Sequence, residues 1–150
     1  MKLDPFEQKI IDKMQPGVLS LSGFLGKDNR HLHEIIEDDF NKLKSLNKTQ
    51  EDIADRLSFF TDKSKDMIED YIIIDDKYQV FQEVYRGLVL CPFNHKGTFK
   101  KAIIKLINIE KNIEIQWTPL NIHMIKEHCF FEGKGSHYRF EPEIIINAIF

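Results

Sequence analysis

Apolar residues recur every three or four positions along most of the first 70 residues, which predicts amphipathic helices. The clearest stripe runs through residues 32–46, whose opposite face is charged. Asp28 or Asn29 precedes this stripe, and we expect one of these side chains to cap the helix. Thr49 opens a third helical stretch in the same way. The first half of the chain is therefore predicted to be mainly helical.

The pattern changes after residue 70, where β-branched and aromatic residues dominate. Residues 99–109 and 113–117 predict a hairpin, since apolar and polar residues alternate in the second arm. Pro119 then opens a helix, and a short apolar helix closes the chain. We expect one α+β domain over residues 1–150: N-terminal helices, then a small antiparallel sheet with a hairpin-helix unit, and a short C-terminal helix.

Charge is distributed unevenly between the two halves. The chain has 150 residues and a formal net charge of -3, the acidic residues being in excess in the helical half. Lys96, Lys100, Lys101 and Lys105 give a local basic group along the first arm of the hairpin, but lysine is also typical of edge strands. The acidic balance disfavours a nucleic-acid partner, whereas a protein partner or a homodimer remains open.

Neither the length nor the polarity of any apolar run suits a membrane span, and the start of the chain lacks the pattern of a secretory signal. The chain has two cysteines, Cys91 and Cys129. In a reducing compartment these are expected to be free thiols or metal ligands. We therefore expect a cytoplasmic protein with no membrane partner.

Four residues with metal-binding side chains flank the predicted hairpin. Cys91 and His95 precede it, and His123 and His128 follow it, in the pattern C-x3-H, 27 residues, H-x4-H. One thiolate and three imidazoles suit tetrahedral zinc. The pattern predicts a structural zinc ion clasped between the turn at residues 91–95 and the helix at residues 123–128. The same residues would also fit a buried cysteine and hydrogen-bonded core histidines, with no metal.

Glu127 is a rival ligand to His128. At about 100° per residue, His123 and Glu127 share a helix face, whereas His123 and His128 diverge by about 140° unless the helix ends there. A set containing Glu127 would leave a coordination position for water, as catalytic zinc requires. Glu127 is accordingly the candidate ligand or general base of an enzyme.

A glycine-containing loop near the C-terminus carries three basic side chains, Lys134, His137 and Arg139. Two glycines allow backbone amides to converge, so this loop is a candidate anion-binding site. The alternative is a plain loop in which Arg139 pairs with Glu141 or Glu143.

These patterns lead to one functional hypothesis and two alternatives. The preferred hypothesis is a small cytoplasmic binding or regulatory domain with the zinc clasp. The first alternative is a metal-assisted hydrolase acting on an anionic substrate, and the second is a helix-mediated protein-interaction module.

Overall fold

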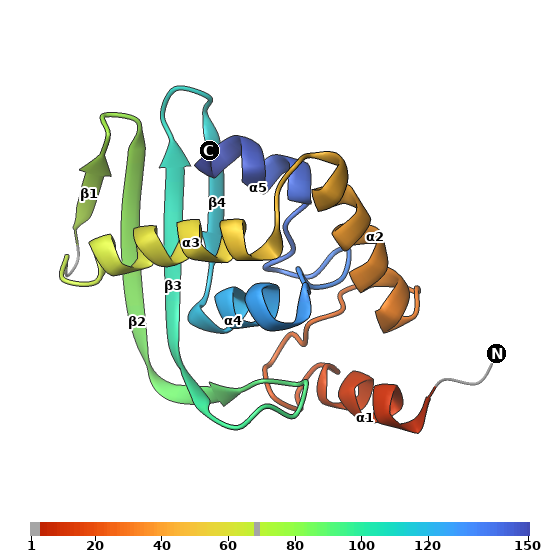
Figure 1. Cartoon of the computed structure of the whole chain (residues 1–150). Coiled ribbons are helices and arrows are strands. Elements are labelled where there is room, and N and C mark those ends of the chain that lie inside the picture. The colour runs from red at the N-terminus through yellow and green to blue at the C-terminus, as the bar shows by residue number, and fades with distance from the viewer. Residues whose placement is uncertain (1–3, 68–69) are drawn as a thin grey trace.

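The computed structural model describes residues 4–67 and 70–150 (Figure 1). Five helices and four strands occur within these residues. In chain order they are α1 (Pro5–Lys13), α2 (Leu32–Ser45), α3 (Gln50–Ser64), β1 (Tyr71–Ile74), β2 (Tyr78–Leu90), β3 (Thr98–Asn108), β4 (Ile113–Trp117), α4 (Pro119–His128) and α5 (Pro142–Ile149). None of the helices in the described ranges is long and apolar enough to cross a membrane.

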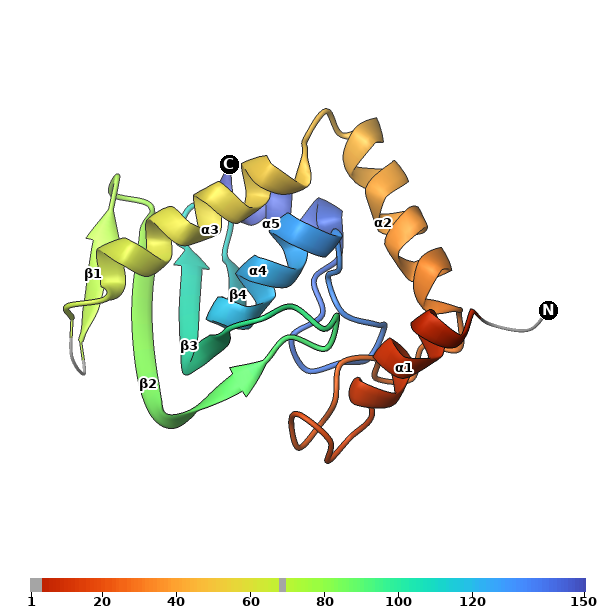
Figure 2. The same cartoon turned by 60° about the horizontal axis from the view of Figure 1, so that its bottom comes forward.

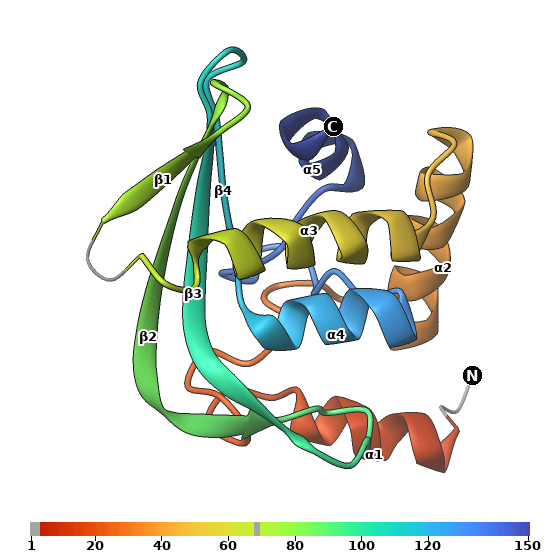
Figure 3. The same cartoon turned by 60° about the vertical axis from the view of Figure 1, so that its left-hand side comes forward.

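The strands form one antiparallel sheet in the order β1-β2-β3-β4. Strands β2 and β3 are long and bend sharply, so that their far ends run beneath the helices (Figure 3). The bend coincides with a bulge in β2 between Val84 and Leu88. Gly87, with a φ of 104°, lies in this bulge, in a region that other residues rarely adopt. The bulge thus carries the β2–β3 turn away from the plane of the sheet.

Helices α3, α4 and α5 lie on one face of the sheet (Figure 3). Trp117, Phe60 and Tyr78 are among the largest buried side chains of the main apolar cluster between these layers. The indole Nε1 of Trp117 donates a hydrogen bond of 2.9 Å to Thr61 Oγ1, which satisfies its buried polar atom. This cluster joins the helical half to the sheet.

A second apolar cluster lies at the bent end of the sheet, where α1 runs beside the β2–β3 turn (Figure 2). It combines Met14 and Ile35 of the helical half with Cys91, Met124 and Phe130. Residues from both halves of the chain therefore build both clusters.

The α+β class and the order of helices before strands are confirmed. Thr49 caps α3 through a reciprocal capping box with Asp52. The predicted cap of α2 is wrong, because the N-cap is His31, which makes no side-chain capping bond. Asp28 instead accepts hydrogen bonds from Arg30 and from the Lys134 backbone amide, so a tertiary contact takes the place of the local cap.

Candidate metal centre

The β2–β3 turn places Cys91 directly after the last residue of β2. Asn94 turns the chain with a φ of 65°, a conformation that asparagine tolerates better than most residues. Its Oδ1 accepts a hydrogen bond from Lys13 Nζ, so α1 supports the turn. Cys91 itself is buried, at 2% exposure, in the second apolar cluster.

The surroundings of the Cys91 sulfur contain too little positive charge to stabilise a thiolate. Burial raises the pKa of the Cys91 thiol, while hydrogen bonds from the backbone amides of Phe93 and His95 act in the opposite direction. The turn thus supplies donors to the sulfur but too little positive charge to ionise it. A bound cation would supply that charge, since a coordinating thiol is deprotonated by the metal.

Helix α4 supplies the two histidines. A capping box between Thr118 and Asn121 fixes its N-terminus, and Cys129 ends it in the left-handed conformation with a φ of 51°. His128 is therefore the last helical residue. Both rings point into the same region, with centroids 5.5 Å apart, despite the five-residue spacing.

Cys91, His123 and His128 converge into one group of candidate metal ligands. Each offers one donor atom, and the three atoms all lie within 4.8 Å of one another. Cys91 Sγ is 3.7 Å from His128 Nε2. Tetrahedral zinc, with bonds of ~2.3 Å to sulfur and ~2.0 Å to nitrogen, sets two such ligands about 3.5 Å apart. The group could hold a metal ion once the donor atoms move closer together.

One atom of this group is left unpaired. Among the side chains that the structure describes, His123 Nε2 is the buried polar atom with no hydrogen-bond partner. An unpaired buried nitrogen costs about 1–3 kcal/mol, so such atoms need a physical explanation. Coordination of a metal would satisfy this nitrogen.

Both histidines are held in the neutral form that binds metals. Burial lowers the pKa of His123, and the neighbouring His95 acts in the same direction. Burial lowers the pKa of His128 to about 4, with smaller contributions from His95 and His123. Neutral imidazoles are available as ligands near pH 7 without losing a proton first.

Aromatic side chains fix the orientation of the rings. Phe93 stacks on His128 with centroids 4.0 Å apart and planes inclined by 9°. Phe99 lies against His123 at 4.5 Å. Both phenylalanines belong to the bent end of β2 and β3, so the same segment that carries Cys91 also restrains the two histidines.

The other two predicted ligands lie at the edge of this group. His95 is exposed, yet its ring centroid is 4.5 Å from that of His128 and 5.1 Å from that of His123. Glu127 is exposed on α4, and its charge acts to raise the pKa of His123, against the larger effect of burial. Its carboxylate is not part of the three-residue group.

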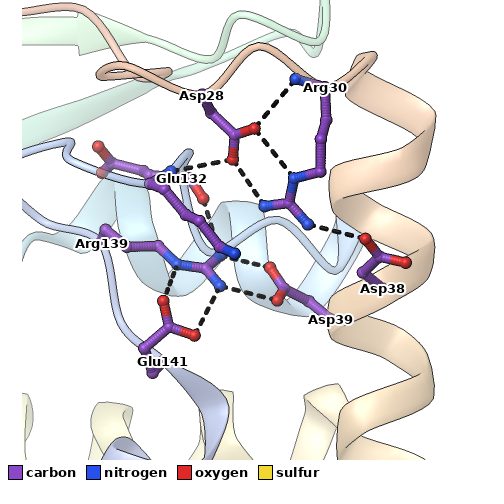
Figure 4. A network of polar contacts seen from close by, with 8 residues as sticks. Asp28, Arg30, Asp38, Asp39, Glu132, Arg139 and Glu141 are labelled. Carbon is purple, nitrogen blue, oxygen red and sulfur yellow. Dashed lines mark hydrogen bonds and ion pairs between the residues drawn. The ribbon is translucent and has the colours of Figure 1, made fainter.

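Of the three basic residues of the C-terminal loop, His137 and Arg139 line one pocket together with Glu141, and Lys134 is not among its lining residues. The Arg139 guanidinium forms two hydrogen bonds with Asp39 and two with Glu141 (Figure 4). Lys134 is exposed, and His137 lies 3.3 Å from the Gln116 side chain. Carboxylates thus balance the charge of Arg139, and the anion site stays a prediction.

Two buried acids escaped the sequence patterns. Asp39 belongs to an acidic run of α2, a pattern that is typical of a solvent-exposed helix face. No local sequence pattern indicates that its partner is Arg139, 100 positions away. Glu132 is 2% exposed and accepts hydrogen bonds from Asn121 and Ser136. Burial raises the pKa of Glu132 to about 7.

These contacts describe a buried cysteine and two half-buried histidines on elements that are far apart in sequence, with a third histidine beside them. No family model, no curated protein and no solved structure matches this chain.

Proposed function

We propose that this protein is a small binding or regulatory domain in which a zinc ion clasps the β2–β3 turn to the C-terminal end of α4. The observation that carries the proposal is the meeting of Cys91, His123 and His128 around a buried nitrogen that has no other partner. A merely structural histidine in a core is normally hydrogen-bonded. Here the missing partner coincides with two further ligand atoms.

Zinc is the metal that best suits these donors. A sulfur and imidazole nitrogens select zinc over magnesium or calcium, which prefer oxygen. Copper(I) also binds sulfur, but the excess of imidazole over sulfur in this group favours zinc. The neutral histidines and the amide donors around Cys91 lower the cost of forming the site.

His95 is the fourth ligand in this proposal. Its ring lies edge-on to His128, and its backbone amide donates to the Cys91 sulfur. As an exposed side chain at the tip of a turn, it can rotate toward the ion at small cost. A closed set of four protein ligands is the arrangement of structural zinc.

The clasp would control the position of the bent β2–β3 segment. This segment packs against the helices through the second apolar cluster, and Lys13 of α1 bonds to its turn. Zinc binding would close the loop between Cys91 and His128, which are 37 positions apart. Release of the ion would free the turn, and this change is what makes a regulatory role physically reasonable.

The test compares two pairs of variants. We expect Cys91→Ser and His123→Gln to lose stoichiometric zinc, as measured by metal analysis after gel filtration and by competition with a chromophoric chelator. Cys129→Ser and His137→Gln are the matched controls, since they change a second buried cysteine and an exposed histidine outside the group. Wild-type protein that purifies without zinc, and binds none on addition, would refute the proposal.

A metal-assisted hydrolase is the second candidate, because three donors meet while His95 remains outside the group. Water would then take the fourth position, with Glu127 as general base. His95→Ala separates the two candidates. The clasp predicts zinc affinity reduced by about tenfold or more, whereas an open site predicts unchanged affinity together with measurable hydrolysis of para-nitrophenyl phosphate.

A further inference from the structure

A cavity of about 320 Å³ lies beside the proposed clasp, between the loop at residues 19–24, the bend of β2 and β3, and residues 132–138. Its walls are mainly apolar and include Leu19, Phe24, Val89 and Leu120. Cavities of this size and composition hold small organic molecules when a few polar groups fix the orientation.

The principal polar group is Glu132, which lines this cavity although its side chain is almost fully buried. Both hydrogen-bond partners of its carboxylate are neutral: Asn121 Nδ2 and Ser136 Oγ. The nearby Arg139 donates to the backbone oxygen of Glu132 and directs its other bonds to Asp39 and Glu141. The buried carboxylate therefore lacks a cationic hydrogen-bond partner.

The aromatic residues of the lining favour a cation as well. Phe24, Tyr85 and Tyr138 are among the residues that line the cavity. A ring face attracts a positive charge, and the effect grows where water is excluded. Lys100 and Lys101 also line the cavity, but both are exposed, so solvent screens their charges.

We propose that this cavity binds a small apolar molecule carrying a protonated amine, with the ammonium group paired to Glu132. The amine would supply the positive charge that the carboxylate lacks, and each carboxylate oxygen retains a lone pair after its bond to Asn121 or Ser136. The apolar part of the ligand would fill the space between Phe24 and Leu120.

The neighbouring groups disfavour a negatively charged ligand. A ligand carboxylate at the same depth would face the Glu132 carboxylate at short range in an apolar environment, where like charges repel strongly. Burial raises the pKa of Glu132 against the opposing effects of its two hydrogen bonds and of the Arg139 charge, so these groups only partly stabilise the charged carboxylate. The inference does not depend on zinc, because none of the three grouped ligands lines the cavity.

The experiment titrates the full chain with three probes of similar size: phenethylamine, phenethyl alcohol and phenylpropionate. Binding is followed by chemical-shift changes of backbone amides in two-dimensional NMR. We expect phenethylamine to bind most tightly, with the largest shifts at residues 19–24 and 132–138. Tighter binding of phenylpropionate, or no binding of any probe, would overturn the proposal.

Glu132→Gln tests the ion pair, because glutamine preserves the shape: its Oε1 can accept from Asn121 Nδ2, and its Nε2 can donate to Ser136 Oγ, which reverses the direction of that bond. We expect this variant to bind phenethylamine about tenfold more weakly or worse, and to bind phenethyl alcohol with unchanged affinity. Glu51→Gln is the matched control, on an exposed position of α3. Equal affinity of wild type and Glu132→Gln for the amine would contradict the inference.

Leu19→Trp provides a test that leaves Glu132 intact. Leu19 is half-buried on the loop side of the cavity, so a larger side chain there would occupy ligand space. We expect this variant to bind both phenethylamine and phenethyl alcohol more weakly than the wild type does. If Leu19→Trp leaves the amine affinity unchanged, the probe binds elsewhere and the proposed cavity is wrong.

Discussion

The polar side chains around Arg139 and those around His123, two partly buried clusters among the described residues, differ in how their polar atoms are satisfied. Around Arg139, every hydrogen-bonding nitrogen of the guanidinium meets an acceptor on Asp39, Glu141 or Glu132 (Figure 4). Around His123, a buried nitrogen has no partner, and the nearest polar groups are a thiol and two further imidazoles.

This difference separates a structural cluster from a candidate binding site. Both contain side chains that sequence patterns mark as potential ligand contacts. The arginine cluster is balanced within the chain, so a ligand there would have to displace existing ion pairs. The histidine cluster gains a partner when a metal binds, which is why the metal proposal rests on it.

The largest effect is expected when the balanced cluster is broken. Arg139→Ala would leave Asp39, which is 4% exposed, as an unpaired buried charge. We expect the free energy of unfolding to fall by about 3–5 kcal/mol, measured by urea denaturation. The double variant Asp39→Ala, Arg139→Ala should be less destabilised than the two single changes added together. Additive losses would show that the two side chains are not coupled.

The histidine cluster should respond to metal instead. With free zinc at about a hundredfold its dissociation constant, we expect the free energy of unfolding to rise by about 2.7 kcal/mol, because only the folded state presents the assembled site. Denaturation with and without zinc measures this. The variant Cys91→Ser, His123→Gln is the control and should show no response. If the wild type has the same denaturation midpoint with and without zinc, the histidine cluster does not bind the metal and the two clusters do not differ in this way.

Glu132 lies between the two cases, since its carboxylate is hydrogen-bonded only to neutral groups and the nearby Arg139 charge acts on it without a direct bond to the carboxylate. Burial raises its pKa to about 7, so the folded state binds the proton more tightly than the unfolded state does. Stability is therefore highest below about pH 4.5, falls as the pH rises from there to about 7, and is level above that; between pH 5 and 8.5 the loss is roughly 2.5 kcal/mol. Glu132→Gln should flatten this dependence relative to wild type in denaturation curves. Parallel pH profiles would contradict the assignment.

The smallest effect is expected at the exposed rim of the arginine cluster. Asp38 pairs with Arg30 at 2.8 Å, but the Asp38 side chain is 60% exposed. We expect Asp38→Ala to change the free energy of unfolding by less than about 1 kcal/mol, because solvent screens such pairs. A loss comparable to that of Arg139→Ala would mean that burial is not what distinguishes the two pairs.

Local patterns predicted most of the secondary structure. The hairpin around residues 110–112 and the helix that opens at Pro119 lie where the pattern placed them, because turn chemistry and capping act over a few residues. Strand β2, which extends from Tyr78 to Leu90, is different. Its far end crosses a bulge and is largely exposed, so no alternation of apolar and polar residues marks it.

Part of the candidate site could be predicted from the spacing of residues along the sequence alone. Cys91, His95, His123 and His128 could be selected because few residue types bind zinc and their pairs flank a hairpin. Whether Glu127 or His128 joins the group depends on where α4 ends, and this is decided by the left-handed Cys129 and by the ring of Phe93. The cavity and the burial of Glu132 left no signature in any local window.

The sequence by itself determined the α+β class, the main helix and strand positions and the residue types available for a metal, because these depend on interactions between neighbours along the chain. Only the tertiary structure decided which polar groups are satisfied. Arg139 pairs with Asp39 across 100 positions and is neutralised, while the Nε2 atom of His123, on α4, is buried without a hydrogen-bond partner. Satisfaction of a buried polar atom depends on what folding brings within hydrogen-bond distance, and spacing does not contain that information.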